Sequence, residues 1–200
     1  MKLVAPTALL VLVVAGTAWA QDFSADLASR TAQVAQPAQK IFVSGSRIRV
    51  ETGDASGSIL ITDGSAGTAV MVMPRQQVYI ETRNAMAIDM ARLFHPTDPE
   101  DPCSEWLKMM QDRGPGATCR RVGEDTVDGR RTIKFEGVSP EHERGYAWVD
   151  PSLRFIIKVE GANGDGMALE NIREAPQPPA LFTIPAGFRR VDPQQPTPAR

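Results

Sequence analysis

The sequence has few of the residues from which catalytic centres are built. Its 200 residues include two histidines and two cysteines, and it carries none of the motifs of serine hydrolases, zinc proteases, phosphate-binding loops or dinucleotide-binding folds. Dispersed carboxylates such as Glu124, Asp125 and Asp128 leave one route to hydrolytic chemistry open. We therefore expect a protein without enzymatic activity and without a cofactor.

The sequence also lacks clustered metal ligands and an excess of charge of one sign. His142 stands between two acidic residues, but His95, the other histidine, is far from it in sequence, so we expect no metal site. The 22 lysines and arginines nearly balance the 24 aspartates and glutamates, and the two signs are mixed along the chain. Nucleic acids and anionic lipids require a basic surface, so neither is an expected partner.

The longest apolar run lies at the start of the sequence. Residues 8–15 are apolar, follow Lys2 and lead to Ala18-Trp19-Ala20, the pattern of a cleaved signal peptide over residues 1–20. An uncleaved anchor is the weaker alternative, because a bilayer span needs about 20 apolar residues. We expect an exported protein without a transmembrane segment, with a single domain over residues 21–190 and a disordered, Pro- and Gln-rich tail over residues 191–200.

The two cysteines, Cys103 and Cys119, are separated by a segment that contains glycine and proline. In an oxidising compartment such a pair is most simply a disulfide. A redox or metal pair is the alternative, but the spacing is not Cys-x-x-Cys and no histidine lies nearby.

Short runs of β-branched and aromatic residues, separated by turn residues, make up most of the mature sequence and are typical of strands. Ile48 and Val50 alternate with charged residues, so we expect one face of this strand to be buried and the other exposed. Ser44-Gly45-Ser46 fits either a hairpin turn or a bulge, and Asp128-Gly129 is the strongest hairpin signal in the chain. The pattern predicts about ten antiparallel strands.

Residues 84–113 interrupt this pattern with a helical period. Two short amphipathic helices are predicted, with apolar positions Met86, Met90 and Leu93 in the first and Cys103, Trp106, Leu107 and Met110 in the second. Asp101 or Pro102 is well placed to begin the second helix. The predicted fold class is α+β but mostly β: a curved antiparallel sheet whose concave face is covered by the short helices.

Methionine is unevenly distributed, because six of the seven in the mature chain lie between Met71 and Met110. Flexible, polarisable thioethers repack around ligands of varying shape. They also serve as ordinary core filling, and both interpretations stay open. On the first, a cavity between sheet and helices would be lined by Met71, Met73, Met86, Met90, Trp106, Leu107 and Met110.

Read in order, these elements resemble the LolA/LolB-like superfamily of bacterial envelope proteins, which includes uncharacterised members. The similarity covers nearly the whole mature chain, and it is carried by strand-and-turn patterns at residues 40–51, 61–64, 73–79, 123–129, 146–150 and 181–188. No position carries a chemical signature, so no functional residue is transferred.

The resemblance implies a half-barrel of antiparallel strands capped by helices, located in the periplasm, with an apolar cavity that holds a lipid or a lipoprotein acyl chain in some members. Related domains instead serve as envelope-stress sensors. We therefore expect a carrier or binding protein for a hydrophobic or amphiphilic ligand. The alternative is a non-enzymatic structural or stress-sensing envelope protein that binds a protein partner.

Overall fold

The structure is a computed structural model that describes residues 22–30, 39–81 and 96–192. The predicted signal peptide, the first predicted helix with Met86 and Met90, and residues 193–200 lie outside these ranges. A single large sheet dominates the described residues, and it is mostly antiparallel, as the short alternating runs predict.

The sheet contains twelve strands, two more than the sequence pattern predicts, in the order β12-β6-β5-β4-β3-β2-β1-β11-β10-β9-β8-β7. Only β12, at one edge, pairs in parallel. The strands are β1 (Asp22–Arg30), β2 (Gln39–Ser44), β3 (Arg47–Glu51), β4 (Ile59–Asp63), β5 (Thr68–Met73), β6 (Val78–Glu81), β7 (Thr118–Val127), β8 (Arg130–Val138), β9 (Arg144–Asp150), β10 (Phe155–Gly161), β11 (Gly166–Glu174) and β12 (Arg189–Arg190).

Two turns confirm the hairpins that the sequence suggests. Gly45 has a φ of 59° and joins β2 to β3, whose residues pair without a break, so the first of these turns is a hairpin and not a bulge. Asp128 and Gly129 have φ values of 49° and 73° and join β7 to β8. Positive φ at both central residues matches the twist of the flanking strands, which is why Asp-Gly is favoured there.

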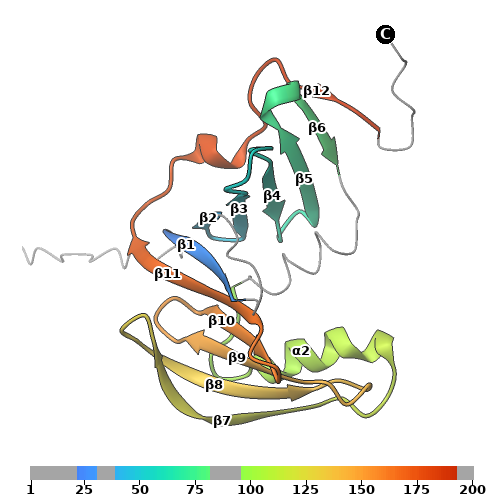
Figure 1. Cartoon of the computed structure of the whole chain (residues 1–200), viewed down its shortest axis with the longest axis vertical. Helices are drawn as coiled ribbons and strands as arrows, with labels where there is room; N and C mark the ends of the chain where they lie inside the picture. The colour runs from blue at the N-terminus through green and yellow to red at the C-terminus, as the bar shows by residue number, and fades with distance from the viewer. Residues whose placement is uncertain (1–21, 31–38, 82–95, 193–200) are drawn as a thin grey trace, which may run out of the picture.

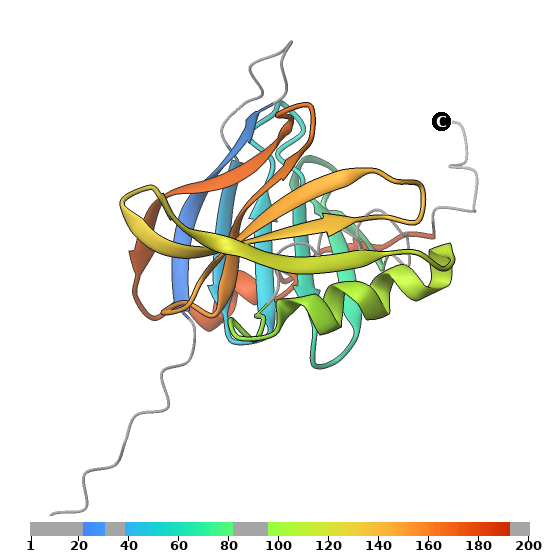
Figure 2. The ribbon, with the colours of Figure 1, turned by 90° about the horizontal axis from the view of Figure 1, so that it is seen from below.

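The sheet bends into two arms. In Figure 1 the strands β2–β6 run upright and β7–β10 run across below them, and the view from below in Figure 2 shows the same crossing. The sheet does not close into a barrel, because β7 and β12 are both edges. The one α-helix in the described residues, α2 (Pro102–Met110), contacts β7 and β8 on the side that faces the other arm. The protein is thus a curved half-barrel with a helix on its concave side, which confirms the predicted fold class.

The concave face holds the main core. Directly opposed residues of antiparallel strands share a face, and the register places Ile41, Val50 and Leu60 in one such row. Phe23 of β1 packs edge to face against Phe155 of β10 with ring centroids 5.1 Å apart, and both are fully buried. This pair joins the two arms. The core comprises Phe23, Ala25, Leu27, Ile41, Val43, Ile48, Val50, Leu60, Leu153, Phe155, Ile157 and Leu169.

The opposite face of the β3–β5 region is also covered, which differs from the expected exposed face. The segment after β11 forms a short 3₁₀ turn, η3 (Pro179–Phe182), and buries Phe182 against Ile61 and Val72. Arg49 donates from Nη1 to the Leu181 carbonyl at 2.9 Å. Long-range docking of the C-terminal segment therefore buries a strand face that local alternation assigns to solvent.

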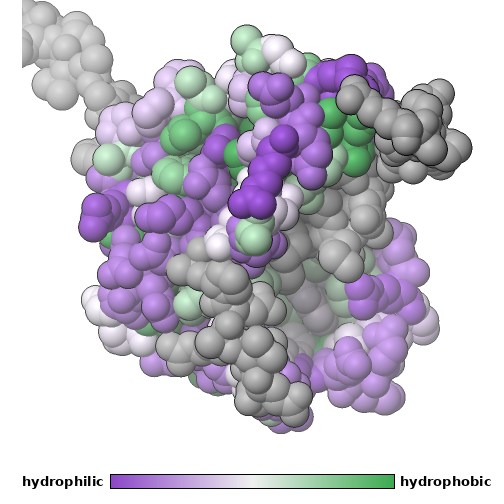
Figure 3. All heavy atoms as spheres, turned by 45° about the horizontal axis from the view of Figure 1, so that its top comes forward, coloured by the Kyte–Doolittle hydropathy of each residue, from purple (hydrophilic) through white to green (hydrophobic). Residues whose placement is uncertain are grey.

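Polar side chains predominate on the face shown in Figure 3, with apolar ones in small groups between them. Within the described ranges, no helix has the length and apolarity that a membrane crossing requires.

Candidate functional site

A pocket of about 640 Å³ lies between α2 and the strands β8–β11. It opens on the concave side of the sheet. Its wall residues Phe135, Ala147 and Val159 are directly opposed on β8, β9 and β10 and therefore share a face. This row continues to Met167 on β11, which shares its face with the core residue Leu169. The residues that line it are Thr97, Pro102, Glu105, Trp106, Lys108, Met109, Asp112, Cys119, Phe135, Gly137, Ser139, Glu143, Arg144, Gly145, Tyr146, Ala147, Ile156, Val159, Glu160, Gly161, Asp165 and Gly166.

The start of α2 is fixed by a cap and a proline. The Asp101 carboxylate accepts a hydrogen bond from the Ser104 hydroxyl and another from its backbone N–H at 3.1 Å, and Pro102 occupies the first turn. The second of these bonds satisfies a free N–H at the helix start, and the two together lower the pKa of Asp101 below its ordinary value. The sequence prediction for this helix start is confirmed.

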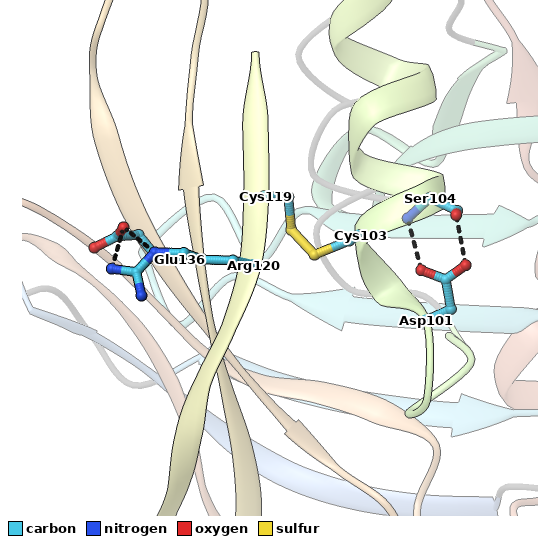
Figure 4. Close-up of a disulfide and its surroundings, with 6 residues drawn as sticks. All are labelled: Asp101, Cys103, Ser104, Cys119, Arg120 and Glu136. Carbon is cyan, nitrogen blue, oxygen red and sulfur yellow. Dashed lines mark hydrogen bonds and ion pairs between the residues drawn. A yellow bond between two sulfur atoms is a disulfide. The ribbon is translucent and has the colours of Figure 1, made fainter.

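A disulfide attaches α2 to the sheet. Cys103, in the first turn of the helix, is bonded to Cys119 at the start of β7, with an S–S distance of 2.01 Å (Figure 4). Arg120, the next residue of β7, points the other way and holds Glu136 with an Nη2 to Oε1 distance of 2.8 Å. Alternation along β7 thus places the crosslink on the pocket side and the ion pair on the opposite side.

The chain that leads into α2 forms one end of the pocket. The Thr97 backbone N–H donates to the Arg154 carbonyl at 2.8 Å, which ties this segment to the turn before β10. The Thr97 hydroxyl donates to Glu105 of α2 at 2.9 Å. One threonine therefore connects the helix to the turn between β9 and β10.

Three glycines form the floor of the pocket. Gly137 of β8 is directly opposite Gly145 of β9, and Gly145 is directly opposite Gly161 of β10. The Trp106 indole lies on Gly137, so close that a Cβ at this position would be 2.9 Å from its Cζ2 atom. A glycine inside a strand often marks a place where another group approaches the backbone closely, and at Gly137 that group is the helix tryptophan.

The charged residues of the pocket are mainly acidic. Five carboxylates compare with two cations, and one of these cations, Arg144, lies 3.7 Å from Glu136. The carboxylates are Glu105, Asp112, Glu143, Glu160 and Asp165, and the cations are Lys108 and Arg144. The lining therefore combines apolar side chains with an excess of carboxylates, of which Glu160 is paired with Lys158.

The structure places the predicted cavity residues in two different environments. Trp106 lines the pocket, together with Met109, which the prediction omits. Leu107 and Met110 are on the same helix outside the lining, and Met110 is buried. Met71 and Met73 lie on β5 in the other arm, where Met71 packs against the main core. Met86 and Met90 lie outside the described residues.

The floor glycines were missed by sequence reasoning, because each directly adjoins a run that reads as a strand and was assigned to no strand itself, whereas the structure extends β8, β9 and β10 over them. The carboxylates considered for hydrolysis do not meet in the pocket. Glu124 is paired with Arg131 at 2.7 Å, and Asp125 accepts a hydrogen bond from Trp148 Nε1 at 2.8 Å.

The convex side of the β8–β10 arm carries a second group of interacting side chains. Lys134 and Lys158 lie over the Trp148 ring, 4.6 and 4.1 Å from its centroid. The Trp148 hydrogen bond is the largest of the effects that lower the pKa of Asp125, followed by the hydrogen bond from the Thr126 N–H and the charges of the two lysines. Trp148 is 2% exposed, so this cluster closes the convex face and leaves the concave pocket as the candidate site.

Comparison with known proteins supports the fold alone. No protein-family model matches the sequence, and no curated protein matches it significantly. Among solved structures, an uncharacterized conserved protein from Thermus thermophilus superposes with a TM-score of 0.54 at 10% identity, over 85% of this chain and 89% of that one. PNGF-II gives 0.51 at 7% identity, over 82% of this chain and 30% of its own.

MucB is a further structural neighbour, with a TM-score of 0.52 at 13% identity. The match covers 82% of this chain and 57% of MucB, so this chain spans little more than half of that protein. Structures of MucB with MucA have also been solved, one of them from Pseudomonas aeruginosa. The curved half-barrel that the LolA/LolB-like resemblance implies is thus a fold shared with these proteins.

Proposed function

We propose that this protein binds a hydrophobic or amphiphilic ligand, such as a lipid or a lipoprotein acyl chain, in the pocket under α2 and carries it without chemical change. The observation that carries the proposal is the combination of volume and lining. A pocket of about 640 Å³ lies within the size range of small-molecule sites, roughly 300–1,000 Å³. Its interior is formed by the apolar side chains of Trp106, Met109, Phe135, Ile156 and Val159.

The arrangement suits an amphiphile because the lining offers both apolar and charged groups. The apolar residues gather between helix and sheet, and carboxylates such as Glu143 and Asp112 stand among the lining with them. An apolar body would replace water against the wall, and each Å² of apolar surface so buried contributes about 25 cal/mol. A polar end would stay among the charged side chains.

We further propose that the protein works in the periplasm after export through the segment of residues 1–20. N-terminal sequencing of the protein recovered from the periplasmic fraction then gives Gln21 as its first residue. Recovery of a chain that starts at Met1 in the membrane fraction would contradict this.

Native mass spectrometry tests ligand binding directly. The purified protein is incubated with a fatty acid, a monoacylglycerol and an acylated peptide, and we expect a one-to-one adduct with at least one of them. Trp106→Phe should weaken the adduct, whereas Trp148→Phe, which changes a tryptophan on the opposite face, should leave it intact. A protein that stays empty against all three, in both wild-type and Trp148→Phe form, would refute the proposal.

A second candidate function is supported by one observation, the structural similarity to MucB, which has been solved with MucA. On this proposal the protein is a structural or stress-sensing component that binds a protein partner. Pull-down from envelope extracts distinguishes the two, because this candidate requires a stoichiometric partner that survives delipidation.

A further inference from the structure

The glycine row in the pocket floor is unusual for a strand region. Glycine loses more conformational freedom on folding than any other residue and offers no side chain for packing. Gly137, Gly145 and Gly161 nevertheless occupy directly opposed positions on three neighbouring strands. Neither Gly137 nor Gly145 nor Gly161 has a positive φ, so turn geometry does not require glycine at any of them. The remaining reason for glycine at these positions is that the space above the backbone must stay free of their own side chains.

At Gly137 the Trp106 indole occupies this space. A Cβ there would be 2.9 Å from Trp106 Cζ2 and 3.1 Å from both of its ring neighbours, Cε2 and Cη2. Near-equal distances to three consecutive ring atoms mean that the indole turns its face, and not its edge, toward the backbone. The glycine floor therefore accepts a flat aromatic ring at contact distance.

At Gly145, in the middle of the row, this space is not filled by any side chain in the described ranges. A Cβ there would meet a single atom within 4 Å, the Glu160 backbone oxygen at 3.6 Å. At Gly161 it would meet the Asn163 side chain at 3.0 Å. The open part of the floor thus lies between the Trp106 indole and the β10–β11 turn. Adjacent strands are about 4.8 Å apart, so Gly137 and Gly161, which lie on either side of Gly145, are separated by about 10 Å.

The charges around this space oppose an anionic ligand. The lining has five carboxylates and two cations. Glu160 lies on the same face of β10 as Lys158 and pairs with it at 2.7 Å, so it adds no net charge to the pocket. Arg144 is likewise held 3.7 Å from Glu136. The other charged residues of the lining are four carboxylates and one cation, Lys108. The Glu143 and Asp112 carboxylates stand beside the cavity. A carboxylate or phosphate on the ligand would meet net negative charge.

We propose that the ligand of this pocket carries a flat apolar ring system without an anionic group, and that the ring lies on Gly145 beside the Trp106 indole. This inference rests on the proposed ligand-binding function and narrows its ligand class. It separates a ring-bearing, neutral or cationic amphiphile from a bare acyl chain and from a free fatty acid.

Two fluorescent probes with the same ring skeleton test the charge. N-phenyl-1-naphthylamine is neutral, and 1-anilinonaphthalene-8-sulfonate adds one sulfonate to that skeleton. In titrations at equal ionic strength we expect the neutral probe to bind about tenfold more tightly or better. Equal affinity for both probes would overturn the claim that the site rejects anions.

Variants of the floor test the ring position. Gly145→Val adds a side chain where the ring is placed, and we expect it to weaken binding of the neutral probe by about tenfold or more. Gly123→Val on β7 is the matched control, because a Cβ there meets nothing within 4 Å and Gly123 lies outside the pocket lining. Binding by this control should equal wild type. If Gly145→Val does not fold, as judged by circular dichroism, Gly145→Ala should still weaken the probe detectably.

A neutral acyl-chain ligand, monooleoylglycerol, separates this inference from the proposed function. If it binds more tightly than the naphthylamine probe and Gly145→Val leaves the probe unaffected, the ring inference is wrong while ligand binding stands. If neither ligand binds, the proposed function itself is wrong. Tight probe binding that Gly145→Val removes and Gly123→Val preserves is the result we expect.

Discussion

Removal of the Cys103–Cys119 bond should lower the free energy of unfolding by about 3 kcal/mol. The two cysteines are 16 residues apart, and closing a loop of that length restricts the unfolded chain by this amount in the loop-entropy model. For a domain of this size, each kcal/mol changes the melting temperature by about 2–4 °C, so the reduced protein should melt about 6–12 °C lower. The effect acts mainly on the unfolded state, so the fold should survive at room temperature.

Urea unfolding followed by tryptophan fluorescence measures this loss. Three samples are compared: the oxidised protein, the protein with reductant, and the Cys103→Ala/Cys119→Ala variant. Reduction removes the bond but keeps both side chains, whereas the variant also removes the packing of Cys103 on the Ile133, Phe135 and Val149 cluster. The variant should therefore be somewhat less stable than the reduced protein. The dependence on urea should steepen in both, because an unfolded chain without the crosslink exposes more surface.

Two results would refute the reasoning. A loss below about 1 kcal/mol on reduction would mean that the unfolded chain is not restricted by the bond as the loop model states. A reduced protein that loses its near-ultraviolet dichroism without urea would mean that the bond holds the folded state together, and not that it restricts the unfolded one.

Three further outcomes are expected. Gly137→Ala should lower the free energy of unfolding in urea by about 1–3 kcal/mol, because the added methyl group meets the Trp106 ring. Gly123→Ala, the control, should change the stability little, and equal effects of the two substitutions would contradict the packing of Trp106 on Gly137. Phe182→Ala should cost about 3–5 kcal/mol, since it uncovers the outer face of β4 and β5, and a cost under about 1 kcal/mol would show that the C-terminal segment does not hold this face. The pKa of Asp101 is lower in the folded protein than its ordinary 3.8, so its ionised form stabilises the fold above about pH 4 and this contribution is lost as the pH falls further. Asp101→Asn should reduce the dependence of the urea midpoint on pH between about 5 and 2.5, and an unchanged dependence would contradict the cap.

Local sequence signals predict the elements that depend on neighbouring residues. Asp128-Gly129 predicts its hairpin because both residues tolerate positive φ, and the start of α2 follows from an acidic cap followed by Pro102. The pairing of Cys103 with Cys119 follows from there being two cysteines in a chain expected to be exported. Each of these signals acts within about twenty residues of sequence.

The features that the sequence does not reveal depend on distant segments. Arg49 alternates with apolar neighbours and reads as exposed, but its side chain is 12% exposed because Leu181, 132 residues away, lies against it. The described methionines are divided between two places, because Met71 packs against the main core whereas Met109 lines the pocket. Only the register of β8, β9 and β10 brings the glycines together.

The central position of β1 has a consequence for when this protein folds. The strand pairs with β2 on one side and with β11 on the other, so the first and last long strands of the described chain meet in the middle of the sheet. Loop closure of this length is slow, because its entropic cost must be met before the contacts form. The two arms therefore cannot join until residue 174 is available to pair with β1. In the export that we propose, the chain would therefore lack its central strand pairing until β11 had crossed the membrane.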